Sequence, residues 1–198
     1  MYSYKVEQAI RAASILHKDQ VRKGALPIPY ISHLISVMLI LSDYTNDEDT
    51  IIAALLHDTI EDTPYTESEM REDFGNNVTN IVLHVTEPSH NKNGVKTSAL
   101  EKKVAYIDQL QVAPEAALMV AAADKSHNFR TVVEEYTGVY DRFFKDFGPS
   151  TDKRLEVYQA ISDVLNSRLK NAIVHEFNHT FTEYKEFLIN AKKSRDEH

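Results

Sequence analysis

Apolar residues recur along most of the chain at intervals of three and four positions, the spacing that places them on one face of an α-helix. This pattern predicts a first helix over residues 4–20, a second over 31–44 and a third over 47–59. Residues 51–56 are apolar on every side, which is typical of a buried central helix. The sequence therefore predicts an all-α fold, a helical bundle.

Two pairs of residues have the spacing of a helix-capping box. Thr66 with Glu69, and Ser98 with Glu101, place a hydroxyl three positions before a glutamate, so each pair predicts the start of a helix. We expect the first of these helices to be short and to stop at Gly75. The two capping boxes therefore add two helices to the predicted bundle.

The segments between and after these helices contain the usual interrupting residues. Residues 88–94 form a polar stretch that predicts a loop, and Pro114 is well placed in the first turn of a further helix. From residue 136 onward we expect two or three more helices, interrupted near Gly148-Pro149. The core is expected over about 4–135, with the added C-terminal helices over about 136–190.

Composition narrows the class of protein. A chain of 198 residues with 42% hydrophobic content is expected to form one domain, 1–198. The net charge of −8 disfavours binding to nucleic acid or to an anionic membrane, and no stretch has the length and apolar character of a membrane span. The absence of cysteine fits a cytoplasmic protein and leaves imidazoles and carboxylates as metal ligands. Apolar surface on the C-terminal helices could support a homo-oligomer.

The dipeptide His57-Asp58 ends the most apolar helix of the sequence. A carboxylate beside a buried helix is costly unless it is paired or bound to a metal ion. One interpretation is a buried hydrogen bond between the two side chains, and the other is a pair of metal ligands. The dipeptide alone leaves both interpretations open.

Four further positions favour metal binding. Glu61 and Asp62 follow one turn later, and such a cluster of acids repels itself without a cation. Asp124 ends the apolar run 119–124, and His33 precedes an apolar helix. Taken singly, His33 could be a helix-start residue and Asp124 could pair with a neighbouring cation. Together these residues supply two imidazoles and two aspartates from three helices.

The sequence resembles a known family over about two-thirds of its length. It is similar to the HD-domain hydrolases and, within them, to the RelA/SpoT-type alarmone hydrolases, including the small stand-alone enzymes that lack a synthetase domain. The matching segments, in the family's order and spacing, are HKDQVRKG at 17–24, PYISHLISV at 29–37, TIIAALLHDTIEDT at 50–63, FGNNVTNIVLHVTE at 74–87 and ADKSHNFRT at 123–131. The stretch AALLHDTIEDT, followed by FG and VTE, is specific to this branch.

The resemblance implies a metal centre and a catalytic pair. The implied ligands of a divalent metal ion, typically Mn²⁺, are His33, His57, Asp58 and Asp124. Glu61 and Asp62 then become the catalytic pair. A carboxylate beside the attacking water can accept its proton, so Glu61 is the candidate for that role and Asp62 would assist in positioning.

The resemblance also implies a binding site for a small-molecule nucleotide. The family places residues at the positions of Arg22, Lys23, Asn128 and Thr131 around the guanine base and the phosphates. An arginine can stack on a base or bind phosphate with two hydrogen bonds, and an asparagine can both donate to and accept from a base edge. The other interpretation of Arg22 and Lys23 is that they are solvated surface residues. Tyr30 and Lys18 are weaker candidates for the same pocket.

Three functions remain open at this point. The favoured function is hydrolysis of the 3′-pyrophosphate of guanosine tetra- or pentaphosphate, which the resemblance implies. An alternative keeps the metal centre but changes the substrate to another nucleotide or phosphorylated cofactor, such as NADPH. A non-enzymatic nucleotide sensor or scaffold is disfavoured, because Glu61 and Asp62 are both present.

Other histidines require separate interpretations. Residues 175–179, HEFNH, fit the zinc-protease pattern HExxH. Little chain follows this motif to supply a third ligand, no strand precedes it, and a charged helix can produce it by chance. We expect His17 and His127, which lie in matched segments, to be hydrogen-bonded structural residues and not ligands.

Overall fold

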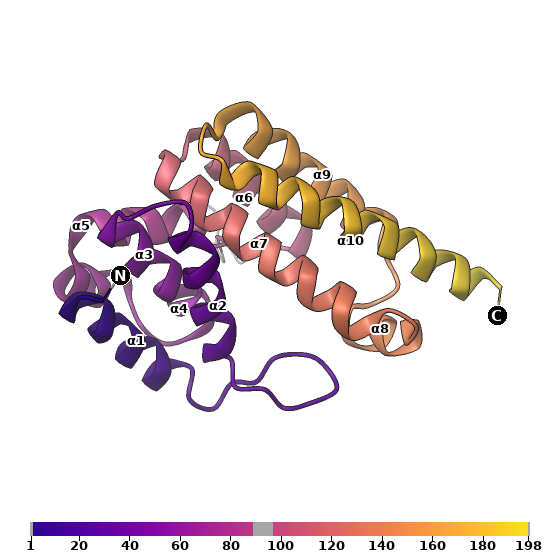
Figure 1. Cartoon of the computed structure of the whole chain (residues 1–198), viewed down its shortest axis with the longest axis horizontal. Helices are drawn as coiled ribbons and strands as arrows, with labels where there is room; N and C mark the ends of the chain where they lie inside the picture. Colours follow the sequence, from indigo (N-terminus) through magenta and orange to yellow (C-terminus); the bar gives the residue numbers. More distant parts are fainter. Residues whose placement is uncertain (1, 89–96, 198) are drawn as a thin grey trace.

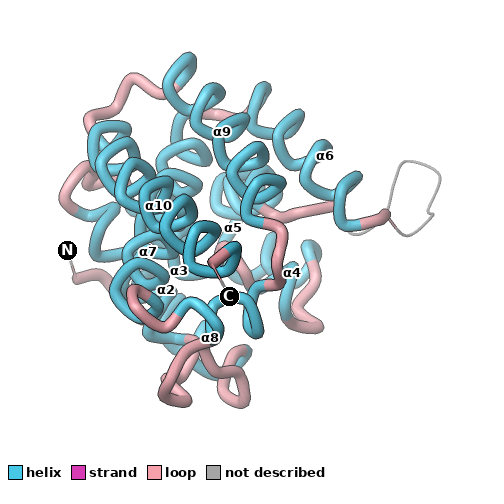
Figure 2. Tube along the Cα trace, turned by 90° about the vertical axis from the view of Figure 1, so that its right-hand side faces the viewer, coloured by secondary structure: helices cyan, strands magenta, loops and turns pink. Residues whose placement is uncertain are grey.

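The computed structural model describes residues 2–88 and 97–197, and within them the regular structure is helical (Figures 1 and 2). Antiparallel pairing there is limited to one isolated bridge between Val21 and Pro29. The prediction of an all-α fold is confirmed. The helices are α1 (Tyr4–Leu16), α2 (Ile31–Ser42), α3 (Glu48–Leu56), α4 (Thr59–Asp62), α5 (Glu67–Val85), α6 (Ala99–Val112), α7 (Glu115–Tyr136), α8 (Tyr140–Phe147), α9 (Thr151–Arg168) and α10 (Ile173–Asp196).

Helix α3 is the centre of the N-terminal half of the molecule. All seven of its residues from Thr50 to Leu56 are buried, and the helix packs against α1, α2, α5 and α7 (Figure 1). An apolar helix surrounded by other helices removes its whole surface from water, which is why its sequence lacks a polar face. The prediction of a buried central helix over residues 51–56 is confirmed.

Helix α7 joins the two halves of the molecule. Its first part is buried continuously from Ala117 to Asp124, where it packs against α2, α3 and α5. Along its other side lies α10, and the two helices run side by side through much of the C-terminal half (Figure 1). Aromatic rings fill this interface, with Phe129 stacked on Tyr184 at a centroid distance of 4.5 Å.

Local capping explains where several helices begin. The side chain of Asp47 accepts a hydrogen bond from the backbone N–H of Thr50 at the start of α3. Both predicted capping boxes, Thr66 with Glu69 and Ser98 with Glu101, are present at the starts of α5 and α6. These two predictions are therefore confirmed.

Two predicted helices end earlier than expected. Helix α1 stops at Leu16 with His17 as its C-terminal cap, so residues 17–20 belong to the loop that leads to α2. Helix α3 stops at Leu56, where His57 is the cap and Asp58 begins the separate short helix α4. At the end of α3 the chain leaves the helix and brings His57 and Asp58 into the site described below.

The prediction that a short helix stops at Gly75 is confirmed, because the backbone of Gly75 is not helical, with φ 87° and ψ 172°. Helix α5 (Glu67–Val85) consists of two helical segments that meet at this residue, and the second segment was not predicted. A positive φ is open to glycine at little cost, so the chain can change direction there and resume the helix. The loop predicted over residues 88–94 lies almost entirely outside the described residues.

The C-terminal part follows the predicted break. Gly148 ends α8 with φ 79° and separates it from α9, and α10 then returns along α9 and α7. Buried apolar side chains form one connected cluster from Val6 to Ala191. Within the described ranges no helix is both long and apolar enough to cross a membrane.

Substitution of Gly75 by alanine tests the bend in α5. A Cβ atom added there meets no neighbouring atom within 4 Å, so any cost arises from the positive φ alone. We expect Gly75→Ala to lower the free energy of unfolding by about 1 kcal/mol, measured by urea denaturation. Asn80→Ala, at an exposed position of the same helix, is the control and should cause no loss. A Gly75→Ala protein as stable as the original would contradict the conformation described for residue 75.

Candidate metal centre and substrate pocket

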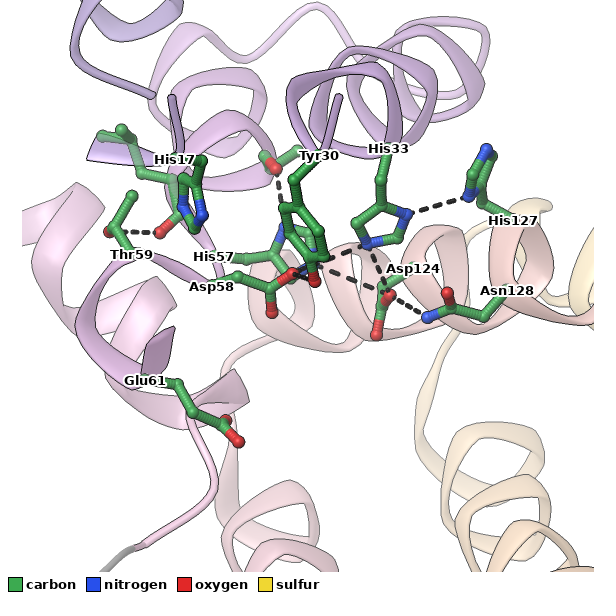
Figure 3. Close-up of polar contacts among 12 residues, drawn as sticks. His17, Tyr30, His33, His57, Asp58, Thr59, Glu61, Asp124, His127 and Asn128 are labelled. Atoms are coloured by element: carbon green, nitrogen blue, oxygen red, sulfur yellow. Dashed lines mark hydrogen bonds and ion pairs between the residues drawn. The ribbon is translucent and has the colours of Figure 1, made fainter. Parts of the chain in front are cut away.

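Four side chains from three parts of the chain meet where α2, α7 and the end of α3 come together (Figure 3). The Nε2 atom of His33 lies 3.2 Å from Oδ1 of Asp124 and 3.6 Å from Oδ2 of Asp58. The Nε2 atom of His57 lies 3.2 Å from Oδ2 of Asp58 and 3.6 Å from Oδ1 of Asp124. The structure thus brings together all four residues of the ligand set that the sequence suggested.

The arrangement fits a divalent cation. Ligand atoms of His33, His57 and Asp58 all lie within 4.8 Å of one another. The Nε2 atom of His57 is buried and has no hydrogen-bond partner, which is costly for a polar atom unless something binds it. Two imidazole nitrogens and carboxylate oxygens form a donor set that suits divalent first-row metal ions. These residues could therefore hold a divalent metal ion.

Charge within this cluster is unevenly distributed. Burial lowers the pKa of His33, and interaction with Asp124 only partly offsets this effect. Burial also lowers the pKa of His57, but the carboxylates of Asp58 and Asp124 outweigh it and raise this pKa to about 9. The two imidazoles therefore differ, since the carboxylates favour the charged form of His57 whereas burial favours the neutral form of His33.

The imidazoles of His33 and His57 are each held at Nδ1, the ring nitrogen that faces away from the carboxylates. The Nδ1 atom of His57 lies 2.8 Å from the carbonyl oxygen of Ala54, and Nδ1 of His33 lies 2.8 Å from Nδ1 of His127. Each Nε2 atom therefore faces the carboxylates, as a metal ligand requires. His127 is hydrogen bonded, as expected. His17 also meets the expectation, since its Nδ1 atom lies 2.7 Å from Oε1 of Gln20.

Three donors hold the two carboxylates. The hydroxyl of Tyr30 donates to Oδ2 of Asp58 at 2.7 Å. Asn128 donates from Nδ2 to Oδ1 of Asp124 at 2.6 Å, and Lys125 donates to Oδ2 of the same residue at 2.6 Å. Burial raises the pKa of Asp124, but Lys125 and the two imidazoles outweigh this effect and hold it well below its usual value. These contacts therefore favour the ionised form of Asp124.

Glu61 and Asp62 lie on α4, beside the cluster. The Glu61 carboxylate points away from the imidazoles (Figure 3) and accepts a hydrogen bond from the backbone N–H of Glu87 at 2.9 Å. Burial raises the pKa of Glu61, and it also raises the pKa of Asp62, where the charge of Asp58 adds to the effect. The structure places both acids near the four-residue cluster without a direct contact to its imidazoles.

A pocket of about 350 Å³ contains all four substrate-binding residues suggested by the sequence. They are Arg22, Lys23, Asn128 and Thr131. The guanidinium of Arg22 donates to Oδ1 of Asn128 at 2.7 Å and lies 5.5 Å from the ring centroid of Tyr30. The Lys23 ammonium donates to the carbonyl oxygen of Asp146 at 2.8 Å and lies over Phe147.

The C-terminal helices supply pocket residues that sequence reasoning missed. Arg154 and Tyr158 from α9, and Tyr184 from α10, line the same pocket. The Nε atom of Arg154 is buried without a hydrogen-bond partner, while its NH2 group donates to the carbonyl oxygen of Phe147 at 2.7 Å. No local pattern in the sequence distinguishes Arg154 from the exposed charges around it, so only the packing of α9 on α7 reveals it.

The HExxH motif lies away from the cluster, on α10. Glu176 is paired with Arg130, His179 lies 3.7 Å from Glu183, and Phe177 is buried in the core. Among the described residues, the group that could hold a metal ion is the one containing His33. The motif is explained by the amphipathic pattern of α10.

Comparison with known proteins defines the class of the chain. The sequence pattern of the HD domain matches residues 9–142, which is more than half of the chain, so this protein belongs to the HD-domain family. The resemblance found in the sequence is thereby confirmed, and the matched range contains the complete His/Asp cluster.

Several individual relatives come from the RelA/SpoT group. The chain is 37% identical over 125 residues to the guanosine-3′,5′-bis(diphosphate) 3′-pyrophosphohydrolase MESH1 of Xenopus tropicalis, covering 62% of this chain and 66% of that protein. It is 34% identical over 128 residues to the bifunctional (p)ppGpp synthase/hydrolase SpoT of Escherichia coli K12, covering 65% of this chain but 18% of SpoT. A GTP pyrophosphokinase of Streptomyces coelicolor is 36% identical over 128 residues, covering 65% of this chain but only 15% of the relative.

Two solved structures resemble this chain over most of its length. A metazoan ortholog of SpoT, described as hydrolysing ppGpp, superposes with a TM-score of 0.76 and 26% identity over 92% of this chain and 97% of that one. A crystal structure of a protein from Listeria monocytogenes EGD-e superposes with a TM-score of 0.66 and 27% identity, covering 84% of this chain and 99% of that one. The likeness therefore extends into the C-terminal helices.

The raised pKa of His57 predicts a pH dependence of the metal-free protein. A pKa of about 9 in the folded state, against 6.5 for a free side chain, gives stability that is present below pH 6.5 and lost as the pH rises toward 9. In a chelating buffer, we expect the free energy of unfolding to fall more between pH 6.5 and pH 9 in the original protein than in His57→Gln. Urea denaturation at the two pH values measures the difference. An equal fall in both proteins would contradict the protonation assigned to His57.

Proposed function

We propose that this protein is an Mn²⁺-dependent phosphohydrolase that removes the 3′-pyrophosphate from guanosine tetra- or pentaphosphate. The observation that carries the proposal is the convergence of His33, His57, Asp58 and Asp124 beside a pocket lined by cations and aromatic rings. The printed activities of MESH1 and of the metazoan SpoT ortholog support the choice of substrate.

In this proposal, the metal ion would be held by the Nε2 atoms of His33 and His57 and by carboxylate oxygens of Asp58 and Asp124. When bound, a divalent cation supplies a stronger nucleophile from water near neutral pH and neutralises charge on the phosphoryl oxygens. The donor set suits Mn²⁺, which accepts both imidazole and carboxylate ligands. The hydrogen bonds from Tyr30 and Asn128 would orient the two carboxylates.

Glu61 would act as the general base. Its pKa is raised by burial, which moves the carboxylate toward the range in which it can accept a proton near neutral pH. To do so, Glu61 would exchange its hydrogen bond to the backbone of Glu87 for one to the attacking water. Asp62 would assist in positioning, since its backbone oxygen already ties α4 to Gln20 at 2.8 Å.

The substrate would occupy the pocket with its base near Arg22 and its phosphates toward the metal centre. Arg22 can stack on a purine, while Asn128 and Thr131 can hydrogen bond to its edge. Lys23 and the incompletely bonded Arg154 offer positive charge to the phosphate groups. These local cations would attract an anionic nucleotide despite the overall charge of −8.

The first test separates metal binding from turnover. With Mn²⁺ and guanosine tetraphosphate, we expect the original protein to release inorganic pyrophosphate. Asp58→Ala should lose metal and activity, whereas Glu61→Ala should retain the metal and lose activity by about 10²–10⁴-fold. Bound Mn²⁺ and pyrophosphate release are measured in parallel. Asp108→Ala, at an exposed position of α6, is the control and should behave like the original protein.

The same assay distinguishes the substrates. Release of orthophosphate from NADPH, without release of pyrophosphate from guanosine tetraphosphate, would replace the proposed substrate by the phosphorylated cofactor. Equal activity in the original protein, Asp58→Ala and Glu61→Ala would overturn the site itself.

A second test concerns the base-binding side of the pocket. We expect Arg22→Met to raise KM for guanosine tetraphosphate by about tenfold or more with a smaller effect on kcat, because it removes a binding contact and no catalytic group. Steady-state kinetics measures both constants. Arg71→Met removes a solvent-exposed arginine from an ion pair on α5 and should leave KM unchanged. An unchanged KM in Arg22→Met would leave Arg22 as a surface residue.

A further inference from the structure

We propose that His127 is a positioning residue for the metal centre. It would accept a hydrogen bond from Nδ1 of His33 and so leave Nε2 of His33 unprotonated and free to bind the metal ion. This inference rests on the proposed function, because it concerns the same metal centre. It adds a residue beyond the four ligands and the catalytic pair.

The geometry places His33 between two partners on opposite edges of its ring. Its Nδ1 atom lies 2.8 Å from Nδ1 of His127, and its Nε2 atom lies 3.2 Å from Oδ1 of Asp124. The centroids of the two imidazole rings are 4.9 Å apart, and the ring planes make an angle of 51°. His33 is 1% exposed, so water cannot easily replace a lost partner. Figure 3 shows the resulting line of contacts from His127 through His33 to Asp124.

The number of protons on the two rings determines the direction of the hydrogen bond between His33 and His127. A neutral imidazole carries one N–H, and only one proton can occupy the space between the two Nδ1 atoms. If Nε2 of His33 is a metal ligand, the proton of that ring must be on Nδ1. His127 must then be the acceptor, with its own proton on Nε2. If His127 donated instead, the proton of neutral His33 would be on Nε2 and would block metal binding.

The two histidine ligands differ in the kind of partner that they have. Nδ1 of His57 faces the carbonyl oxygen of Ala54, which can only accept a hydrogen bond. The partner of His33 is a side chain that can either donate or accept. Metal binding through His33 therefore depends on a residue that substitution can remove, whereas the orientation of His57 depends on the backbone.

Helix α7 keeps His127 in register with the metal centre. Asp124, His127 and Asn128 are spaced by three and four residues, so they lie on one face of the helix. His127 contacts His33 while Asn128 contacts Asp124. One face of α7 thus supplies the candidate ligand Asp124. The same face orients Asp124 through Asn128 and His33 through His127.

The experiment compares Mn²⁺ affinity in three variants of the full chain. Loss of the acceptor would leave the Nδ1–H of metal-bound His33 buried and unpaired, so His127→Leu should weaken Mn²⁺ binding by about 10–100-fold. An amide oxygen can replace the ring nitrogen, so His127→Asn should restore affinity to within about threefold. His175→Leu, at an exposed position of α10, should not alter it. Titration of free Mn²⁺ by electron paramagnetic resonance measures the three dissociation constants.

A spectroscopic measurement on the unaltered protein does not depend on whether His127→Leu folds. In the protein loaded with diamagnetic Zn²⁺, long-range ¹H–¹⁵N correlation should show His33 protonated at Nδ1 and His127 protonated at Nε2. A proton on Nδ1 of His127 in that state would overturn the inference. So would Mn²⁺ affinity in folded His127→Leu equal to that of the original protein.

These outcomes are separate from the failure of the proposed function. If the original protein did not bind Mn²⁺ at all, the metal centre and the proposed hydrolase would both be rejected. If it bound Mn²⁺ and hydrolysed guanosine tetraphosphate while His127→Leu retained full affinity, only the positioning role would be rejected.

Discussion

The packing of the Asp58 and Asp124 carboxylates against the same pair of imidazoles is the interaction on which the rest of this structure depends. Asp124 is buried and Asp58 is partly buried. The two carboxylates repel each other and lose part of their hydration, so the fold has to supply compensating charge and donors. Tyr30 donates to one carboxylate and Lys125 and Asn128 donate to the other. The raised pKa of His57 favours positive charge between them. A divalent cation would provide this compensation more completely than one proton can.

Helix α7 connects the His/Asp cluster to the pocket, because it carries both Asp124 and Asn128. Asp124 belongs to the cluster, and Asn128, one turn later, holds Asp124 with its amide nitrogen while its amide oxygen accepts from Arg22. A nucleotide that displaced this contact between Asn128 and Arg22 would act on the same amide that orients a proposed metal ligand. In the proposed complex, substrate binding and the geometry of the metal centre would therefore be linked through the side chain of Asn128.

Sequence patterns could predict the features that depend on nearby residues. The burial of α3 and the capping boxes at Thr66 and Ser98 follow from local spacing, and the His/Asp set followed from polar residues at the ends of apolar helices. The end of a helical segment at Gly75 also follows from local sequence, but the segment that begins directly after it was not predicted. Arg154 was missed because its burial depends on distant helices and not on its neighbours in sequence.

The His/Asp cluster lies wholly within the matched domain, whereas part of the pocket comes from helices that follow it. The HD-domain match ends at residue 142 and includes the whole His/Asp cluster with Glu61. Arg154, Tyr158 and Tyr184 lie beyond that boundary and complete the pocket from α9 and α10. Changes in these helices could alter the shape and charge offered to a nucleotide without moving a residue of the cluster. Hydrolysis and recognition of the base by Arg22 and Asn128 would then depend on the matched domain. The C-terminal helices would adjust which phosphate esters fit against α7.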